Sequence, residues 1–280
     1  MKKAASSVRK ATVKSGRFII PYRVYENDAP HIICVNGIQQ SMGMWHTFVS
    51  RFCGKYRIVL FDFPNHGKAK IIFGSSQISL DERVMILKTV MEEAGVNQDA
   101  TLCAASWGGV VALVMAANYP DRIKTLILAS LSLRANQKMV ETIKAGGAID
   151  INQRDKMAQV LLNSFGDKLP LRFKEKIINQ FRTMTEPEIR SFYEHGLSVI
   201  SSKKLSDAVD LGKVKAKTIL LNGENDTIID LKDVSSLASK IAHCKMMVIN
   251  GVGHFLHMES ESVLDIYEDI LASETNPSLN

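Results

Sequence analysis

A serine between small residues is the first feature of the sequence that indicates chemistry. Ser106 lies in CAASWGG (residues 103–109), where an apolar, strand-like run ends and a helix-like run begins. A nucleophilic serine is presented on such a tight strand-to-helix turn, which requires small residues beside it. The usual pattern is G-x-S-x-G, and Ala104 replaces its first glycine here. The stretch therefore predicts a nucleophile elbow with Ser106 as the attacking group.

A nucleophilic serine needs a base and a carboxylate that orients the base. For this strand–turn–helix setting the expected chain order is Ser, then Asp or Glu, then His. Asp226 follows the apolar run TILL (218–221), and His254 follows MMVI (246–249) within a glycine-rich loop. Because three suitable groups occur in this order, each after a predicted strand, we predict a Ser106–His254–Asp226 triad.

Nearby residues offer alternatives for the acid and the base. Glu224 lies close to Asp226, but the chain has already turned at the preceding glycine, so we expect Glu224 to face solvent. Asp230 is expected to cap the helix that follows it. His257 lacks the flanking glycines of the predicted base, and His66 is expected to be structural.

The negative charge of a tetrahedral intermediate must be held by N–H groups. Trp107 follows the nucleophile at a helix N-terminus, so its backbone N–H is one predicted donor. The second is expected in the loop after the run IICV (32–35), where Gly37 permits close approach and Ile38 is the predicted donor. Asn36 is expected to anchor this supporting loop through side-chain hydrogen bonds.

The sequence contains no signature of a metal or cofactor site. None of the seven histidines begins an H-x-x-x-x-D motif, no metal-ligand spacing occurs, and G-x-x-x-x-G-K is absent. We therefore expect no metal, nucleotide or flavin cofactor. The four cysteines are scattered, and those in apolar runs are expected to be buried, reduced thiols.

Strand-like runs alternate with helix-like stretches along most of the chain. Strands are predicted at 17–25, 31–35, 57–61, 100–104, 125–129, 218–221 and 245–249, and helices at 80–94, 107–118, 231–241 and 260–271. Several strands are continuously apolar, as expected when helices cover both faces of a parallel sheet. The predicted fold class is α/β, with a mostly parallel central sheet flanked by helices.

Residues 131–210 lack strand-like runs and are rich in helix formers. This stretch is predicted to be a helical cap, inserted before the strand that bears the acid and lying over the edge where the loops of the sheet gather. The predicted core consists of residues 1–130 and 211–280.

Composition excludes several classes of protein. Hydrophobic residues make up 46% and charged residues 23% of the 280 residues, which is typical of globular proteins and not of disordered ones. No apolar run reaches the roughly 18 residues of a membrane span, and no apolar h-region follows the basic N-terminus. We therefore expect a soluble, cytoplasmic protein. The net charge of +6 comes without an arginine-rich arm or aromatic platform, so no nucleic-acid partner is predicted.

Taken together, these motifs resemble those of the α/β-hydrolase superfamily and, within it, the RhlA type of 3-hydroxyacyl transferase. The matching stretches are VNG (35–37), VLFD (59–62) with Pro64, ASWGG (105–109), NQ (136–137), NG (222–223) with Asp226, and GHFL (253–256) with Glu259. The resemblance implies an α/β-hydrolase fold. It also implies a reaction that joins two 3-hydroxyacyl chains into a 3-(3-hydroxyalkanoyloxy)alkanoic acid, the lipid precursor of rhamnolipid biosurfactants, in bacterial lipid metabolism.

The resemblance further implies a thioester substrate carried by acyl carrier protein or coenzyme A. Apolar cap residues would then cover the acyl chain, and a basic cluster on the cap would allow transient docking of an acidic acyl carrier protein. The candidate apolar cover is Leu133, Met139, Leu161, Leu162, Phe165 and Leu169, and the basic cluster is Lys168, Arg172, Lys174, Lys176 and Arg182. Both sets have a plainer interpretation, as cap core and as a solvated helix face.

Three alternatives share these motifs. A serine esterase or thioesterase would use the same triad with water as the acceptor. The related PhaG type of transferase moves a 3-hydroxyacyl group from acyl carrier protein to coenzyme A. A catalytically silent member of the superfamily would only bind a ligand, but such a protein would usually have lost a member of the triad. The sequence does not decide the acyl length, the carrier or the oligomeric state.

Overall fold

The computed structural model of the chain describes residues 7–38, 40–132, 134–201 and 209–275. Within them the strands are β1 (Val8–Ser15), β2 (Phe18–Tyr25), β3 (His31–Val35), β4 (Arg57–Phe61), β5 (Lys70–Ile71), β6 (Ala100–Ala105), β7 (Ile123–Ala129), β8 (Lys217–Gly223) and β9 (Cys244–Ile249). The helices of the core are α1 (His46–Phe52), α2 (Leu80–Glu93), α3 (Gly108–Asn118), α8 (Leu231–Ala238) and α9 (Val263–Thr275).

The strands form one twisted sheet in the order β1-β2-β4-β3-β6-β7-β8-β9, and β5 pairs with β2. From β4 to β9 all neighbouring strands are parallel, whereas β1 and β2 are antiparallel. The predicted mostly parallel sheet with flanking helices is therefore confirmed. The seven predicted strands all form, and β1, β5 and α1 are elements that the sequence patterns did not indicate.

The missed strand β1 has a physical explanation. It forms a hairpin with β2 through a two-residue turn in which Gly16 adopts a φ of 55°. Because β1 is an exposed edge strand, its sequence VRKATVKS keeps several charged residues in solvent and lacks the apolar run that marks the buried strands.

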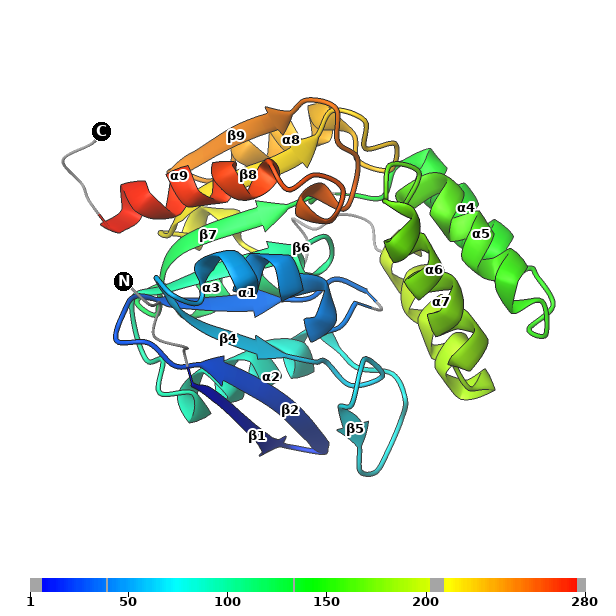
Figure 1. Ribbon diagram of the computed structural model, residues 1–280, viewed down its shortest axis with the longest axis horizontal. Coiled ribbons are helices and arrows are strands. Elements are labelled where there is room, and N and C mark those ends of the chain that lie inside the picture. The colour runs from blue at the N-terminus through cyan, green and yellow to red at the C-terminus, as the bar shows by residue number, and fades with distance from the viewer. Residues whose placement is uncertain (1–6, 39, 133, 202–208, 276–280) are drawn as a thin grey trace.

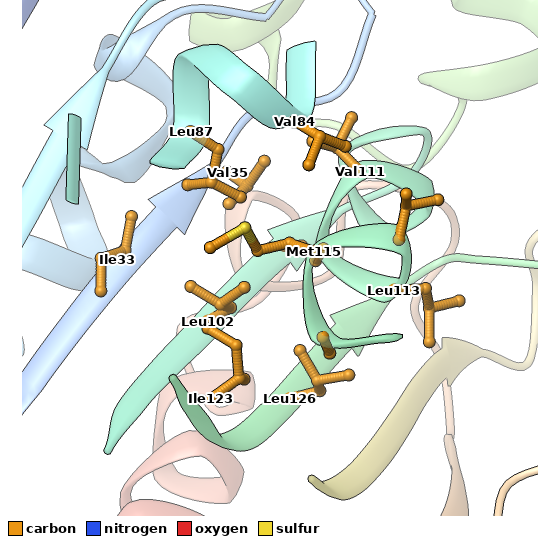
Figure 2. Close-up of a cluster of buried hydrophobic side chains, with 14 of the residues drawn as sticks. Ile33, Val35, Val84, Leu87, Leu102, Val111, Leu113, Met115, Ile123 and Leu126 are labelled. Carbon is orange, nitrogen blue, oxygen red and sulfur yellow. The ribbon is translucent and has the colours of Figure 1, made fainter. Parts of the chain in front are cut away.

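Helices cover both faces of the sheet, and each face has its own apolar core. On one face α2 and α3 pack on the central strands through side chains such as Val84, Leu87 and Met115 against Val35 and Leu102 (Figure 2). On the other face α1 and α9 pack through aromatic side chains, among them Phe48, Phe52 and Tyr267. A capping box between Ser79 and Glu82 starts α2 at Leu80.

Four helices lie between β7 and β8 in the chain: α4 (Gln137–Gly147), α5 (Arg154–Phe165), α6 (Leu171–Thr183) and α7 (Glu186–Ser201). We call them the inserted helices. Helices α5, α6 and α7 share a small core of Met157, Phe181, Ile189 and Phe192. In Figure 1 the arrowheads of β4, β7 and β9 point toward them, so the inserted helices stand beyond the carboxyl ends of the parallel strands.

No helix in the described ranges has both the length and the apolar character required to cross a membrane.

Candidate active site

Ser106 lies on the sharp turn between β6 and α3. Its φ is 49°, a left-handed conformation that a non-glycine residue rarely adopts, and its backbone N–H donates to the Ala129 carbonyl at 2.7 Å. The turn also requires a glycine at 108, because a Cβ there would lie 2.5 Å from the carbonyl oxygen of Asn36 and 2.7 Å from that of Val35. Close packing of β6, α3 and the loop after β3 thus holds the serine at the carboxyl end of the sheet.

The structure brings the three residues of the predicted triad together from three strand ends. His254 Nε2 lies 3.1 Å from Ser106 Oγ, and His254 Nδ1 lies 2.8 Å from Asp226 Oδ2. The histidine and aspartate side chains are 4% and 0% exposed, so bulk water does not compete for the bond between them. The backbone N–H of Ile228 donates to the other Asp226 oxygen at 3.1 Å. Asp226 therefore has one oxygen for the loop backbone and one for the histidine.

The loop that carries His254 is held from two sides. Glu259 accepts hydrogen bonds from the N–H groups of Gly253 (2.5 Å) and Phe255 (2.9 Å), the two neighbours of the histidine. Ser130 Oγ donates to the His254 carbonyl at 2.7 Å. Burial raises the pKa of Glu259 despite these two bonds. The sequence assigned no role to Glu259, although a carboxylate shortly after a glycine-rich loop is a natural acceptor for its free N–H groups.

The alternative acids and bases have other partners. Glu224 is exposed and accepts from the Gly251 N–H at 3.2 Å, and Asp230 caps α8 by accepting from the Lys232 N–H at 2.9 Å. His257 is 3% exposed and stacks on Trp45, with ring centroids 5.3 Å apart, and burial lowers its pKa to about 4. His66 is also buried, which lowers its pKa to about 3.

The loop after β3 approaches the elbow as the sequence suggests. Asn36 donates to the Phe61 carbonyl at 2.8 Å and accepts from Trp45 Nε1 at 2.8 Å, which fixes the start of the loop. A Cβ on Gly37 would lie 3.0 Å from the Ala105 carbonyl oxygen, so the close approach requires a glycine. The Gly37 N–H is occupied by the Gln40 side chain at 2.7 Å.

Ile38 and Trp107 are the predicted oxyanion donors. Ile38 borders the pocket described below, and the N–H of Trp107 donates to no acceptor within the described ranges. Their role in holding an oxyanion stays a prediction.

A pocket of about 290 Å³ opens beside Ser106 and His254, under the inserted helices. Its walls are mostly apolar. Of the proposed acyl cover, the residues that border it are Met139, Leu161, Leu162 and Phe165. Leu169 is buried elsewhere, and Leu133 lies outside the described residues. The pocket volume is close to the lower end of the range for small-molecule sites, about 300–1,000 Å³.

Some residues of the basic cluster on the inserted helices are hydrogen-bonded to neighbouring oxygens, and one borders the pocket. Arg182 makes two hydrogen bonds to Asp155, at 2.6 and 2.5 Å, and Lys174 donates to the Asp167 carbonyl at 2.8 Å. Lys176 borders the apolar pocket, and its Nζ lies 5.3 Å from the centroid of the Phe173 ring. Within the described ranges, no three His, Cys, Asp or Glu side chains gather to hold a metal ion.

Comparisons with known proteins agree with this geometry. A family model described as the alpha/beta hydrolase fold matches residues 30–261. The chain is 22% identical over 271 residues to the (R)-3-hydroxydecanoyl-ACP:CoA transacylase of Pseudomonas putida, covering 94% of this chain and 90% of that protein. It is 24% identical over 276 residues to human monoacylglycerol lipase ABHD6, covering 94% and 82%.

Among solved structures, a thermophilic esterase from Thermogutta terrifontis superposes with a TM-score of 0.77 at 19% identity, covering 95% of this chain and 98% of that one. At this identity the likeness concerns the fold. The overall fold of this chain is therefore shared with that esterase.

Proposed function

Because the chain belongs to the alpha/beta hydrolase fold family, we propose that it is a serine-dependent acyltransferase that acts on 3-hydroxyacyl thioesters. Its proposed product is a 3-(3-hydroxyalkanoyloxy)alkanoic acid, an ester of two 3-hydroxyacyl chains. The observation that carries the proposal is the hydrogen-bonded row Ser106–His254–Asp226 beside an apolar pocket. The named activity of the transacylase relatives supports the 3-hydroxyacyl substrate class.

In the first half-reaction His254 Nε2 takes the proton of Ser106 as its oxygen attacks the thioester carbonyl. Asp226 holds the ring so that the proton on Nδ1 faces the carboxylate and the lone pair on Nε2 faces the serine. The N–H groups of Trp107 and Ile38 would hold the oxyanion. The C–S bond then breaks, the proton on His254 passes to the carrier thiol, and an acyl-serine remains.

In the second half-reaction the 3-hydroxyl of another acyl chain attacks the acyl-serine. His254 accepts the hydroxyl proton and returns it to Ser106 Oγ as the serine ester breaks, so an ester between the two chains forms. Water would compete with this step. We propose that the inserted helices act as a cap that keeps water from the apolar pocket, and that the bound acceptor gains the effective concentration of an oriented reactant, up to ~10⁵ M or more.

A second candidate is transfer of the intact acyl group from acyl carrier protein to coenzyme A, favoured by the names of three curated relatives. A third is hydrolysis, the activity named for the monoacylglycerol lipase relatives. All three share the acyl-serine and differ in the acceptor. The basic cluster that includes Lys176, which borders the pocket, is a proposed docking face for an acidic carrier protein.

Product analysis distinguishes the candidates. The purified protein is incubated with 3-hydroxydecanoyl thioesters of acyl carrier protein and of coenzyme A, and the products are identified by mass spectrometry. The proposal expects a dimeric ester. Mainly free 3-hydroxydecanoic acid would identify a thioesterase, and exchange of the acyl group between the two carriers would identify a transacylase.

The nucleophile is tested separately. Ser106→Ala is expected to remove product formation and labelling by a fluorophosphonate probe, because triad members act together with losses of several orders of magnitude. The exposed Ser236→Ala serves as a matched control that keeps both activities. A folded Ser106→Ala protein with more than a few per cent of wild-type turnover would exclude this serine as the nucleophile.

A further inference from the structure

A second pocket also borders Ser106. It has a volume of about 270 Å³ and lies between the elbow, the start of α2 and the inserted helix α7. Of the described residues that border it, Ser106 and Met139 also border the first pocket. Both pockets therefore border the predicted nucleophile, so an acceptor in one could reach an acyl group on Ser106 whose chain lies in the other.

The two pockets differ in chemistry. The first is bordered mainly by large apolar side chains such as Phe165 and Phe181. The second is bordered by apolar residues and also by polar ones, namely Ser79, Ser130, Ser132, Arg134, His195 and Ser198. This mixture suits a ligand that has both an apolar chain and hydrogen-bonding oxygens.

His195 is the polar residue of this second pocket whose hydrogen bonding is incomplete. Its Nδ1 lies 3.4 Å from Nη2 of Arg83, and its ring stands edge-on to Trp107 at a centroid distance of 4.7 Å. A guanidinium group only donates, so His195 Nδ1 must accept and the ring proton of the neutral imidazole lies on Nε2. This Nε2 is buried and has no partner within the described ranges, so a ligand in the pocket reaches it only after the ring moves. The result is an N–H donor without an acceptor, close to the elbow.

Arg83 makes this region electrically positive. It is 4% exposed, its Nε and Nη1 have no hydrogen-bond partner within the described ranges, and its charge lies over the rings of Trp107 (4.8 Å) and Phe63 (5.6 Å). Burial lowers its pKa to about 10, so it keeps its charge at neutral pH. The neighbouring Glu82 carboxylate offsets the cost of burying this charge only in part. A ligand oxygen with negative or partial negative charge would offset this cost.

We propose that the second pocket is the acceptor site and that His195 donates a hydrogen bond to the C1 oxygen of the acceptor 3-hydroxyacyl group. The inference rests on the proposed function, because it takes the acyl-serine as the partner of the acceptor. Arg83 is a positioning residue that orients the His195 ring. The acceptor C1 is two bonds along the chain from C3, so a C1 oxygen held at His195 leaves the 3-hydroxyl near the elbow.

Two kinds of acceptor carry a C1 oxygen that His195 could bind, a free 3-hydroxy acid and a 3-hydroxyacyl thioester. In both, the oxygen of the 3-hydroxyl forms the new ester bond, its proton passes through His254 to Ser106 Oγ, and the serine ester breaks. With the free acid as acceptor the product is the alkanoic acid itself, whereas with the thioester the product is still a thioester and its acid is released only by a further hydrolysis with water.

The test separates the two half-reactions. Decanoyl-coenzyme A lacks the 3-hydroxyl and serves as the donor, and release of its thiol in a single turnover reports acylation of Ser106. Either isotope-labelled 3-hydroxydecanoic acid or 3-hydroxydecanoyl-coenzyme A is then added as the acceptor. Mass spectrometry of the ester shows which source enters, and its rate of formation gives the acceptor KM.

Two variants address the second pocket. His195→Phe keeps the ring beside Trp107 and removes the donor, and Ser198→Trp fills the pocket while leaving the Arg83–His195 contact in place. Both are expected to raise the acceptor KM at least tenfold and to leave the thiol burst within twofold of wild type. Ile177→Trp, which fills the first pocket, is the matched control and is expected to lower the burst.

The outcomes are distinct. If Ser198→Trp and a folded His195→Phe both leave the acceptor KM within twofold of wild type, the second pocket is not the acceptor site. If Ser198→Trp removes the burst, the pocket holds the donor and the assignment is wrong. A wild-type protein that releases no thiol from decanoyl-coenzyme A or from the 3-hydroxydecanoyl thioester of either carrier would instead refute the proposed function itself.

Discussion

Replacement of Asp226 by asparagine is expected to slow acylation of Ser106 by about 10⁴-fold and to leave the fold intact. Asp226 accepts from the Ile228 N–H on one oxygen and from His254 on the other. In Asp226→Asn the amide oxygen is expected to keep the bond to Ile228, which turns the NH₂ group toward His254. The imidazole must then accept on Nδ1 and carry its proton on Nε2, where it faces Ser106 and cannot act as a base.

The magnitude follows from two contributions. Flipping the amide restores the active tautomer but sets the NH₂ group against the Ile228 N–H, and a lost buried hydrogen bond costs about 1–3 kcal/mol. The productive orientation is thereby about 5- to 150-fold disfavoured. The negative charge that stabilises the imidazolium is also lost. The corresponding substitution in serine proteases lowers kcat about 10⁴-fold, which equals about 5 kcal/mol in the barrier.

The assay is the single-turnover release of thiol from decanoyl-coenzyme A, together with the rate of fluorophosphonate labelling. Glu224→Gln is the matched control, because Glu224 is an exposed carboxylate of the same loop and lies outside the hydrogen-bonded row. The control is expected to stay within threefold of wild type. An active Asp226→Asn protein beside a severely impaired Glu224→Gln protein would show that the wrong acid was assigned.

Three further predictions concern the frame around the site. Gly108→Ala places a Cβ 2.5 Å from a backbone oxygen and is expected to lower the free energy of unfolding by about 1–3 kcal/mol or more in urea titrations, whereas Gly147→Ala, whose nearest contact is 3.5 Å, is expected to change it little. Glu259→Gln leaves only one oxygen acceptor for the two N–H groups beside His254. In steady-state kinetics kcat is therefore expected to fall about tenfold with KM unchanged. Equal changes in kcat and KM would contradict a positioning role. Burial lowers the pKa of His257 from 6.5 to about 4 in the folded state. As the pH falls from 6.5 to 4 the unfolded state therefore binds a proton that the folded state does not, and the free energy of unfolding is expected to fall by about 3 kcal/mol. In urea titrations at several pH values, His257→Phe is expected to flatten this pH dependence.

The sequence alone predicted the parallel strands and the positions of Ser106, Asp226 and His254 in the turns and loops that follow them. Continuous apolar runs such as IICV and TILL are typical of strands that are buried on both faces of a sheet. A serine between an apolar strand and a helix that starts with small residues is typical of a nucleophile elbow. The strands β3, β6, β8 and β9 accordingly formed where they were predicted. Because the carboxyl ends of parallel strands share one edge, the chain order of Ser106, Asp226 and His254 already indicated their proximity.

Other features were decided by contacts between distant parts of the chain. The exposed strand β1 carries no apolar run and is defined by its pairing with β2. The sequence already favoured Asp226 over Glu224 because of the turn at Gly223, and the structure adds the bond from the Ile228 N–H and the burial of the carboxylate, which no local pattern expresses.

Arg83 and His195 illustrate the limit most clearly. They lie 112 residues apart, one on α2 and one on the inserted helix α7. In the sequence each is an ordinary polar residue of an amphipathic helix, with no signal that links them. Only the packing of α7 against the core places the guanidinium beside the imidazole next to Trp107 and leaves a buried N–H without a partner. Hydrogen bonding and burial at this place are properties of the tertiary structure, because they depend on what a side chain meets and not on its neighbours in sequence.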